Sequence, residues 1–307
     1  MTAAATVGDL IQQTRRLLTG SARGAMNRLT SDIDNAVTNI PLDFDPGAAL
    51  GKGGYICIDD EIMYVWQMLS NVAVVQRGEL GTVPAAHTGG TIVEVNARFP
   101  KPMIRDALYD EIDSWPQSVY RTQGFNVDVA TNSYGVDLTP LPATAYDVKQ
   151  VLKKPTTTAS LVRFDPFDTV WRNVGFRLER GMDPAEFASG TALFLNEAMP
   201  GGYTLRIVYA GPFDLSLFAT DATNLISDCG LEPFMTDIPP YGAAWRLVAG
   251  KEVVRTALEA QGEARQTSDT PAGAILRSAT ALEQFRDKRL GEAGNVLVGR
   301  HGWRRTA

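Results

Sequence analysis

Two histidines are the residues of this sequence most able to transfer protons or to bind zinc. His87 lies in the segment AAHTGG, and His301 lies in the segment GRHGWRRTA. A zinc site or a serine–histidine–aspartate triad would have to use one of these imidazoles. The glycines beside His87 favour a simpler role, in which a ring nitrogen hydrogen-bonds backbone groups of a loop. His301 stands among arginines, so we expect its side chain to be exposed or bound to a partner.

The acidic triplet Asp59, Asp60 and Glu61 could in principle bind a hard cation, because carboxylate oxygens suit calcium and magnesium. Neighbouring side chains of a strand point to opposite faces, so the three carboxylates cannot converge on one ion. We therefore interpret Asp59 and Asp60 as the tight turn of a hairpin between YICI and EIMYVWQM. Neither a metal nor a cofactor is expected.

The glycine-rich segments of the sequence do not match a nucleotide-binding loop. In PGAALGKGG, Pro46 stands where the Walker pattern needs its first glycine, and Gly53 stands where it needs a hydroxyl. The sequence also lacks GxSxG, HExxH, CxxC and the dinucleotide fingerprint. These observations favour a structural protein over an enzyme, and an unrecognised hydrolase is kept as a third alternative.

The segment VVQRGELGTVPAAHTGGTIVEV, residues 74–95, contains four glycines between two runs of valine and isoleucine. Gly78 and Gly81 permit a positive φ at a tight turn, and Gly89 with Gly90 permits the return into TIVEV. We therefore interpret this loop as a turn that closes a β-module. No phosphate site is implied.

The sequence of 307 residues has 44% hydrophobic residues, which predicts a globular protein of more than one domain. Residues 271–307 carry a charge of +4, and subtracting it from the total of −6 leaves −10 on the rest of the chain. Such an acidic body argues against general coating of nucleic acid. Cys57 and Cys229 are predicted to be buried thiols, and no signal peptide or membrane span is predicted. A reducing, aqueous compartment is therefore expected.

Helical periodicity predicts a helix near the N-terminus, a second from about 102 to 115, and two more near the C-terminus. Alternating segments predict strands near 54–58, 61–68, 72–77, 91–95, 146–152, 159–165, 171–179, 190–196 and 202–210. The expected fold class is α+β, a helical bundle of N-terminal, central and C-terminal helices with two antiparallel β-rich insertions, each a small barrel or sandwich.

The predicted divisions of the chain follow from these elements. They are 1–35 for the N-terminal helix of the bundle, 36–100 for a β-module, 101–120 for a bundle helix, 121–220 for a second, sandwich-like β-domain, 221–290 for the C-terminal bundle helices and 291–307 for a basic C-terminal arm. Glycines in the arm are expected to weaken continued helix. Trp66, Trp171 and Trp245 are predicted to lie in the core, and Trp303 is interpreted as an interface anchor.

Several segments resemble proteins of tailed bacteriophages. ICIDDEIMYV followed by VVQRGELGTVPAAHTGGTIVEV resembles a β-module of phage virion proteins. VGDLIQQTRRLL, IRDALYDEIDSW and ALEQFRDKRLGEA are similar to head-to-tail connector (adaptor) proteins of the neck. Together these segments cover about half of the chain. The simplest connectors are short and almost wholly helical, whereas this chain adds two β-units.

The resemblance implies a structural protein of the virion neck, made in the cytoplasm of the host bacterium. Connectors of this class form homo-oligomeric rings, usually twelve-fold, which join the portal protein to a downstream neck or tail protein. DNA would pass through the lumen without specific binding, and no membrane is involved. The equivalent C-terminal end contacts the portal, which implies a portal or partner interface at Arg300, His301, Trp303, Arg304 and Arg305.

Other functions remain open at this point. A neck stopper, a tail-hub component or another minor virion protein would share much of the same pattern. A carbohydrate-binding adhesion protein of the virion is an alternative from another class, in which Tyr134 or Tyr203 would stack on a glycan.

Overall fold

The computed structural model of the chain describes residues 6–19, 25–50, 53–129, 133–155, 171–199, 202–260 and 274–301. The chain divides into two compact units. Unit 1 consists of Met1–Ser114, Leu215–Cys229 and Pro233–Arg289, and unit 2 consists of Trp115–Asp214, Gly230–Glu232 and Leu290–Ala307. Each unit is therefore assembled from segments that lie far apart in the sequence.

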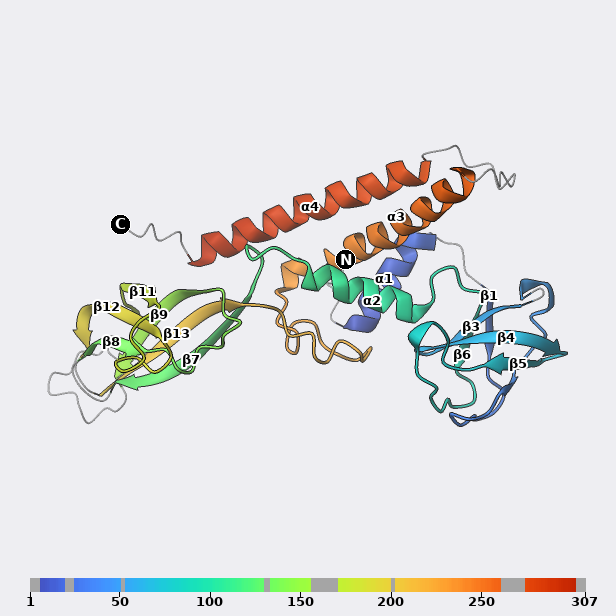
Figure 1. Cartoon of the computed structure of the whole chain (residues 1–307), viewed down its shortest axis with the longest axis horizontal. Helices are drawn as coiled ribbons and strands as arrows, with labels where there is room; N and C mark the ends of the chain where they lie inside the picture. Colours follow the sequence, from blue (N-terminus) through green and yellow to red (C-terminus); the bar gives the residue numbers. More distant parts are fainter. Residues whose placement is uncertain are drawn as a thin grey trace. The chain divides into compact units, whose positions relative to one another are not determined.

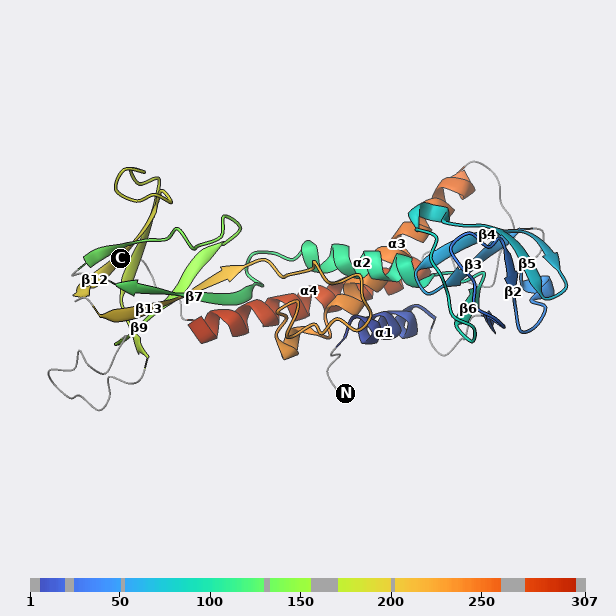
Figure 2. The same cartoon turned by 90° about the horizontal axis from the view of Figure 1, so that it is seen from below.

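Unit 1 contains an antiparallel six-stranded sheet in the order β1-β6-β3-β4-β5-β2 (Figures 1 and 2). Its strands are β1 (Ala25–Arg28), β2 (Asn39–Pro41), β3 (Gly54–Ile58), β4 (Glu61–Leu69), β5 (Val72–Gln76) and β6 (Ile92–Val95). The four strands predicted between residues 54 and 95 correspond to β3, β4, β5 and β6. A two-residue turn joins β3 to β4, with Ile58 paired to Glu61 and a φ of 51° at Asp59.

The outer face of this sheet carries a row of aromatic rings. The ring of Tyr64 lies 5.4 Å from that of Tyr55 and 5.1 Å from that of Trp66, both edge to face. Trp66 is 64% exposed, so its predicted place in the core is wrong. The reason is the period-two alternation of β4, which turns Met63 and Val65 toward the core and Tyr64 and Trp66 away from it.

Four helices are described: α1 (Val7–Thr19), α2 (Lys101–Asp113), α3 (Pro239–Ala260) and α4 (Ala274–His301). Helix α1 begins with a reciprocal cap, in which the backbone N–H of Asp9 donates to Oγ1 of Thr6 and the N–H of Thr6 donates to the Asp9 carboxylate. Helices α1, α2 and α3 contact one another within unit 1 (Figure 1). None of the helices among the described residues has both the length and the apolar character of a membrane span.

A buried carboxylate connects three helices of unit 1. Glu111 of α2 is fully buried, and it accepts hydrogen bonds from Nε of Arg246 at 2.9 Å and from Nε of Arg286 at 2.5 Å. Gly242 of α3 makes room for this side chain, because a Cβ at residue 242 would lie 2.1 Å from Cδ of Glu111. Glu111 is thus compensated by two guanidinium groups that α3 and α4 supply.

Unit 2 is built from two antiparallel sheets, in the orders β10-β9-β13-β7 and β11-β12-β8. The strands are β7 (Arg121–Val129), β8 (Ser133–Asp137), β9 (Asp147–Pro155), β10 (Arg172–Asn173), β11 (Phe176–Arg180), β12 (Thr191–Met199) and β13 (Tyr203–Gly211). The single strand predicted at 171–179 is divided into β10 and β11. The strand predicted at 159–165 lies outside the described residues.

Helix α4 continues beyond residue 290, where the sequence analysis placed the start of the C-terminal arm. The helix passes through Gly291, Gly294 and Gly299 and ends at His301. The glycines were expected to weaken the helix, but the helix nevertheless continues as far as residue 301. Ala293 and Leu297 are buried, and burial of such side chains offsets the cost of about 1 kcal/mol that each glycine adds to a helix.

The predicted fold class, an α+β helical bundle with two β-rich insertions, is wrong. Thirteen strands in three antiparallel sheets dominate the described residues, and only four helices accompany them. The β-units are more than insertions, because each has a hydrophobic core of its own. One core gathers buried side chains between Leu29 and Val95, and the other gathers side chains between Val129 and Tyr209.

Candidate functional site

The loop between β5 and β6 depends on residues whose backbone is left-handed. The φ angle is 68° at Gly78, 83° at Gly81 and 86° at Gly90. Gly89 has a different requirement, since a Cβ there would lie 3.2 Å from Cα of Ser31. Three of the four predicted turn glycines thus provide a positive φ, and Gly89 provides a close approach of two backbone segments.

A bidentate ion pair holds the start of this loop against the β3–β4 hairpin. Nε and Nη2 of Arg77 donate to Oε1 and Oε2 of Glu61 at 2.6 and 2.5 Å. The Glu61 side chain is 1% exposed. Nη1 of Arg77 also donates to the carbonyl oxygens of Asp34 at 2.7 Å and Val37 at 3.0 Å. Arg77 therefore joins the loop, the hairpin and the segment before β2.

His87 fastens the other end of the loop. Its Nδ1 atom lies 3.0 Å from Oδ2 of Asp59, and its Nε2 atom lies 3.0 Å from Oε2 of Glu61. The backbone N–H and carbonyl of His87 exchange two hydrogen bonds with Ile33, each 2.9 Å long. The imidazole is buried, and both ring nitrogens have protein partners. This geometry leaves neither nitrogen available to a substrate.

Glu61 is held in its ionised form by the same contacts. Burial raises the pKa of this carboxyl. Hydrogen bonds from Arg77, from the N–H of Ala85 and from His87 lower the pKa by more than burial raises it, so that the pKa lies below its ordinary value. Arg77, Ala85, His87 and the more distant N–H of Gly78 surround the two oxygens. A carboxylate so fully occupied holds the loop in shape and cannot act as a general base.

Asp60, the second residue of the turn, faces helix α2. Nη1 of Arg105 lies 2.6 Å from Oδ1 of Asp60, and Nη2 of the same guanidinium pairs with Asp221. Nζ of Lys101 lies 2.6 Å from Oδ2 of Asp221 and 3.6 Å from Oδ1 of Asp60. These charges connect the hairpin, the first turns of α2 and the segment before α3 within unit 1.

The three carboxylates of the acidic triplet are all engaged by protein side chains. Asp59 and Glu61 share His87, Glu61 also pairs with Arg77, and Asp60 pairs with Arg105. Within the described part of the chain, no group of three or more histidine, cysteine or acidic side chains is arranged to hold a metal ion. The triplet organises a corner of unit 1 through protein contacts.

A groove of about 680 Å³ opens beside these contacts. It lies between the β3–β4 turn at 59–61, the loop at 80–87, residues 102–106 of α2 and Ala219, and we call it the turn–helix groove. The exposed apolar side chains on its border are Leu80, Val83 and Met103, which are 64%, 77% and 37% exposed. Leu80 has a φ of 52°, a left-handed conformation that leucine rarely adopts.

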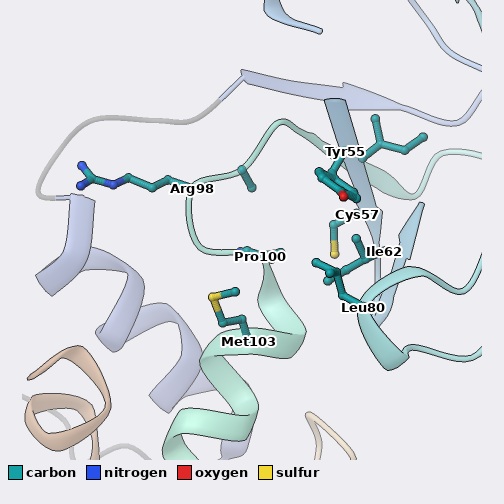
Figure 3. Close-up of a pocket in the computed structure, with 9 residues that line it drawn as sticks. Tyr55, Cys57, Ile62, Leu80, Arg98, Pro100 and Met103 are labelled. Carbon is teal, nitrogen blue, oxygen red and sulfur yellow. The ribbon is translucent and has the colours of Figure 1, made fainter. Parts of the chain in front are cut away.

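A smaller cavity of about 110 Å³ shares Ile62, Leu80 and Met103 with this groove. Figure 3 shows Cys57 and Ile62 on the sheet, Leu80 on the neighbouring loop and Met103 on α2 around it. Burial and the nearby Glu94 carboxylate raise the pKa of the Cys57 thiol to about 12. Such a thiol has little thiolate at neutral pH, so this cavity holds no activated nucleophile.

The predicted C-terminal interface lies partly within the described residues. Nη1 of Arg300 lies 3.0 Å from Oε2 of Glu232 in unit 2. His301 is the last residue of α4. Trp303, Arg304 and Arg305 lie outside the described residues.

The two tyrosines named for glycan binding differ in their surroundings. Tyr134 of β8 is 63% exposed. The ring of Tyr203 lies 6.0 Å from Nζ of Lys153, within the range of a cation–π contact. The structure does not bring these tyrosines together with the loop of unit 1 in one compact unit.

Sequence reasoning missed Arg77 and Leu80, although both stand in the quoted loop. Arg77 and Glu61 are 16 residues apart, and their pairing depends on the register of β4 against β5. The signal for Leu80 was an apolar residue within the turn RGELGT, where a polar side chain is usual. No protein-family model matches the chain, and no curated protein matches it either.

Proposed function

We propose that this protein is a structural component of a tailed-bacteriophage virion, a head-to-tail connector whose ring joins the portal to the tail. The observation that carries the proposal is the mutual bonding of Arg77, Glu61 and His87 inside the segment that resembles phage virion proteins. These groups stabilise a shape, and the loop they hold directs Leu80 and Val83 to solvent. Apolar side chains fixed at a surface favour assembly with another protein.

The charge distribution supports the same proposal. An acidic body lining a channel would repel DNA phosphates, so that DNA passes without binding. The basic C-terminal segment would meet a partner in the virion. In this proposal the ring is homo-oligomeric, with the twelve-fold symmetry usual in the connectors that the sequence resembles.

The test is the mass and symmetry of the purified protein, alone and after mixing with the portal protein of the same phage. Native mass spectrometry and negative-stain electron microscopy are expected to show a closed ring that binds the portal. A protein that stays monomeric in both preparations, and does not sediment with the portal, would contradict the connector proposal. Immunogold labelling of virions would distinguish a connector from a neck stopper or a tail-hub component.

The exposure of Tyr134 supports a second candidate, a carbohydrate-binding adhesion protein of the virion. An exposed aromatic ring is a suitable platform for stacking on a sugar. Glycan-array binding that Tyr134→Ala abolishes would favour this candidate. Tyr55→Ala is the matched control, because Tyr55 is an exposed tyrosine on the sheet of unit 1.

A further inference from the structure

We propose that the turn–helix groove receives the basic C-terminal segment, residues 302–307, of a second copy of the chain. The inference rests on the proposed homo-oligomeric ring and names the contact between its subunits. A contact between two different surfaces of identical subunits closes into a ring when the rotation between neighbours permits. The groove and the segment are such a pair of different surfaces.

The apolar border of the groove is the first argument. Leu80 combines a left-handed backbone with an exposed side chain, and neither feature adds to the stability of the folded chain. A strained residue of this kind costs on the order of 1–3 kcal/mol and is typical of binding sites. Together with Val83 and Met103, Leu80 offers an apolar surface that a large aromatic side chain can cover.

The charge of the groove is the second argument. Asp59, Asp60, Glu61 and Asp106 contribute carboxylates to its lining, and Arg105 contributes a guanidinium group that pairs with Asp60. Asp59 and Asp60 have partners in unit 1, whereas Asp106 makes no side-chain hydrogen bond or ion pair with the residues that the structure describes. Asp106 is exposed, and desolvation together with the neighbouring Asp110 raises its pKa more than Arg105 lowers it, so an arriving cation would find a carboxylate accessible for pairing.

The sequence of the proposed occupant complements both properties. Residues 302–307 read GWRRTA and contain one tryptophan and two arginines without any acidic residue. Trp303 matches the apolar border, and the guanidinium groups of Arg304 and Arg305 match the carboxylates. Acidic groove and basic segment belong to the same chain, so the charge pattern is self-complementary.

The test uses the full chain carrying Trp303→Ala, Arg304→Gln and Arg305→Gln, which leaves the groove intact and changes only its proposed occupant. A fluorescein-labelled peptide of residues 299–307, GRHGWRRTA, is titrated with this protein and followed by fluorescence anisotropy. The peptide is expected to bind, and salt is expected to weaken the binding. A control peptide with the same three substitutions is expected not to bind.

Two groove variants, built into the same full-length protein, locate the binding. Asp106→Asn and Leu80→Gly are each expected to weaken peptide binding about tenfold. Asp113→Asn is the matched control, since Asp113 is an exposed acidic residue of α2 that does not line the groove. Leu80→Gly is also expected to raise the Tm, because glycine adopts a φ of 52° without strain. A leucine with a purely structural role would lose stability instead.

Sedimentation of the unsubstituted chain then identifies which copy supplies the segment. Assembly that Asp106→Asn weakens, and that an excess of free peptide competes away, supports contact with a second copy. Absence of peptide binding, or binding that the groove variants leave unchanged, would overturn the inference even if a ring forms. If the unsubstituted chain is monomeric and does not bind the peptide, whereas the triple variant does, the segment binds the groove of its own chain. That result would overturn both the inference and the proposed ring. A ring that does not depend on the groove would leave the connector proposal standing.

Discussion

Nε2 of His87 lies 3.0 Å from Oε2 of Glu61, and Nδ1 of the same ring lies 3.0 Å from Oδ2 of Asp59. Two carboxylates thus flank one imidazole. The ring can donate to both oxygens only when both of its nitrogens carry protons. A histidine between two carboxylates and beside the Arg77–Glu61 pair serves to hold the loop after β5 against the hairpin before it.

Replacing this histidine is expected to destabilise unit 1 without altering metal content. His87→Ala removes two hydrogen bonds to carboxylates, and we expect the free energy of unfolding to fall by about 2 kcal/mol in urea titrations. Thr88→Ala changes the exposed neighbour and is expected to stay within about 0.5 kcal/mol of the natural chain. Stoichiometric zinc that disappears in His87→Ala would contradict a structural role.

The acid sensitivity of the protein is expected to depend on Glu61. Because its folded-state pKa lies below the ordinary value of 4.5, its contribution to stability is present above that value and is lost as the pH falls through the folded-state pKa. Glu61→Gln is therefore expected to lower the urea midpoint at neutral pH and to flatten its decline in acid. Glu79→Gln, in the same loop, is the control. Parallel pH profiles for Glu61→Gln and the natural chain would refute the assignment.

Two glycine-to-alanine substitutions are expected to act in opposite directions. Gly242→Ala places a methyl group against the buried Glu111 side chain, and we expect the free energy of unfolding to fall by about 3 kcal/mol. Gly291→Ala adds a methyl group with nothing within 4 Å, in a helix, and should increase stability by about 1 kcal/mol. Thermal unfolding followed by circular dichroism measures both. Equal Tm shifts would contradict the packing around Glu111.

The C-terminal segment is expected to be needed for joining heads to tails. Truncation after Leu290 is a poor test, since it removes the buried side chains of Ala293 and Leu297. The triple change Trp303→Ala, Arg304→Gln and Arg305→Gln keeps α4 whole and should reduce the number of tailed particles about tenfold in complementation of a null phage. Normal numbers of joined particles would show that the segment is dispensable.

Short-range patterns in the sequence predicted individual elements well. Alternation between Gly54 and Leu69 located β3, β4 and the turn at Asp59, because period-two burial and turn chemistry are both local properties. Trp66 was wrongly predicted to lie in the core because its hydrophobicity was given more weight than the alternation of β4, which places its side chain on the exposed face. Strands β1, β2, β7 and β8 were not predicted, and β1 and β2 are short and pair with strands distant in sequence.

The fold class and the contacts of the loop could not be derived in this way. The amphipathic helices suggested a bundle as the organising core, yet each β-unit buries a core of its own. The Arg77–Glu61 pair depends on the register between β4 and β5, and no local residue spacing encodes that register. Helix α4 continues through three glycines because of buried contacts at Ala293 and Leu297, which local helix propensity does not include.

Cys57 and Cys229 are both buried, and burial raises the pKa of the Cys57 thiol to about 12. Maleimides react with the thiolate, so a cysteine introduced at an exposed site is expected to be labelled in preference to either natural one. Leu69→Cys in unit 1, which does not line the turn–helix groove, and Tyr134→Cys in unit 2 offer such sites. Donor and acceptor dyes attached there would report, by energy transfer, the distance between the two units during ring assembly. Dyes can therefore be attached at chosen sites without first replacing the two natural cysteines.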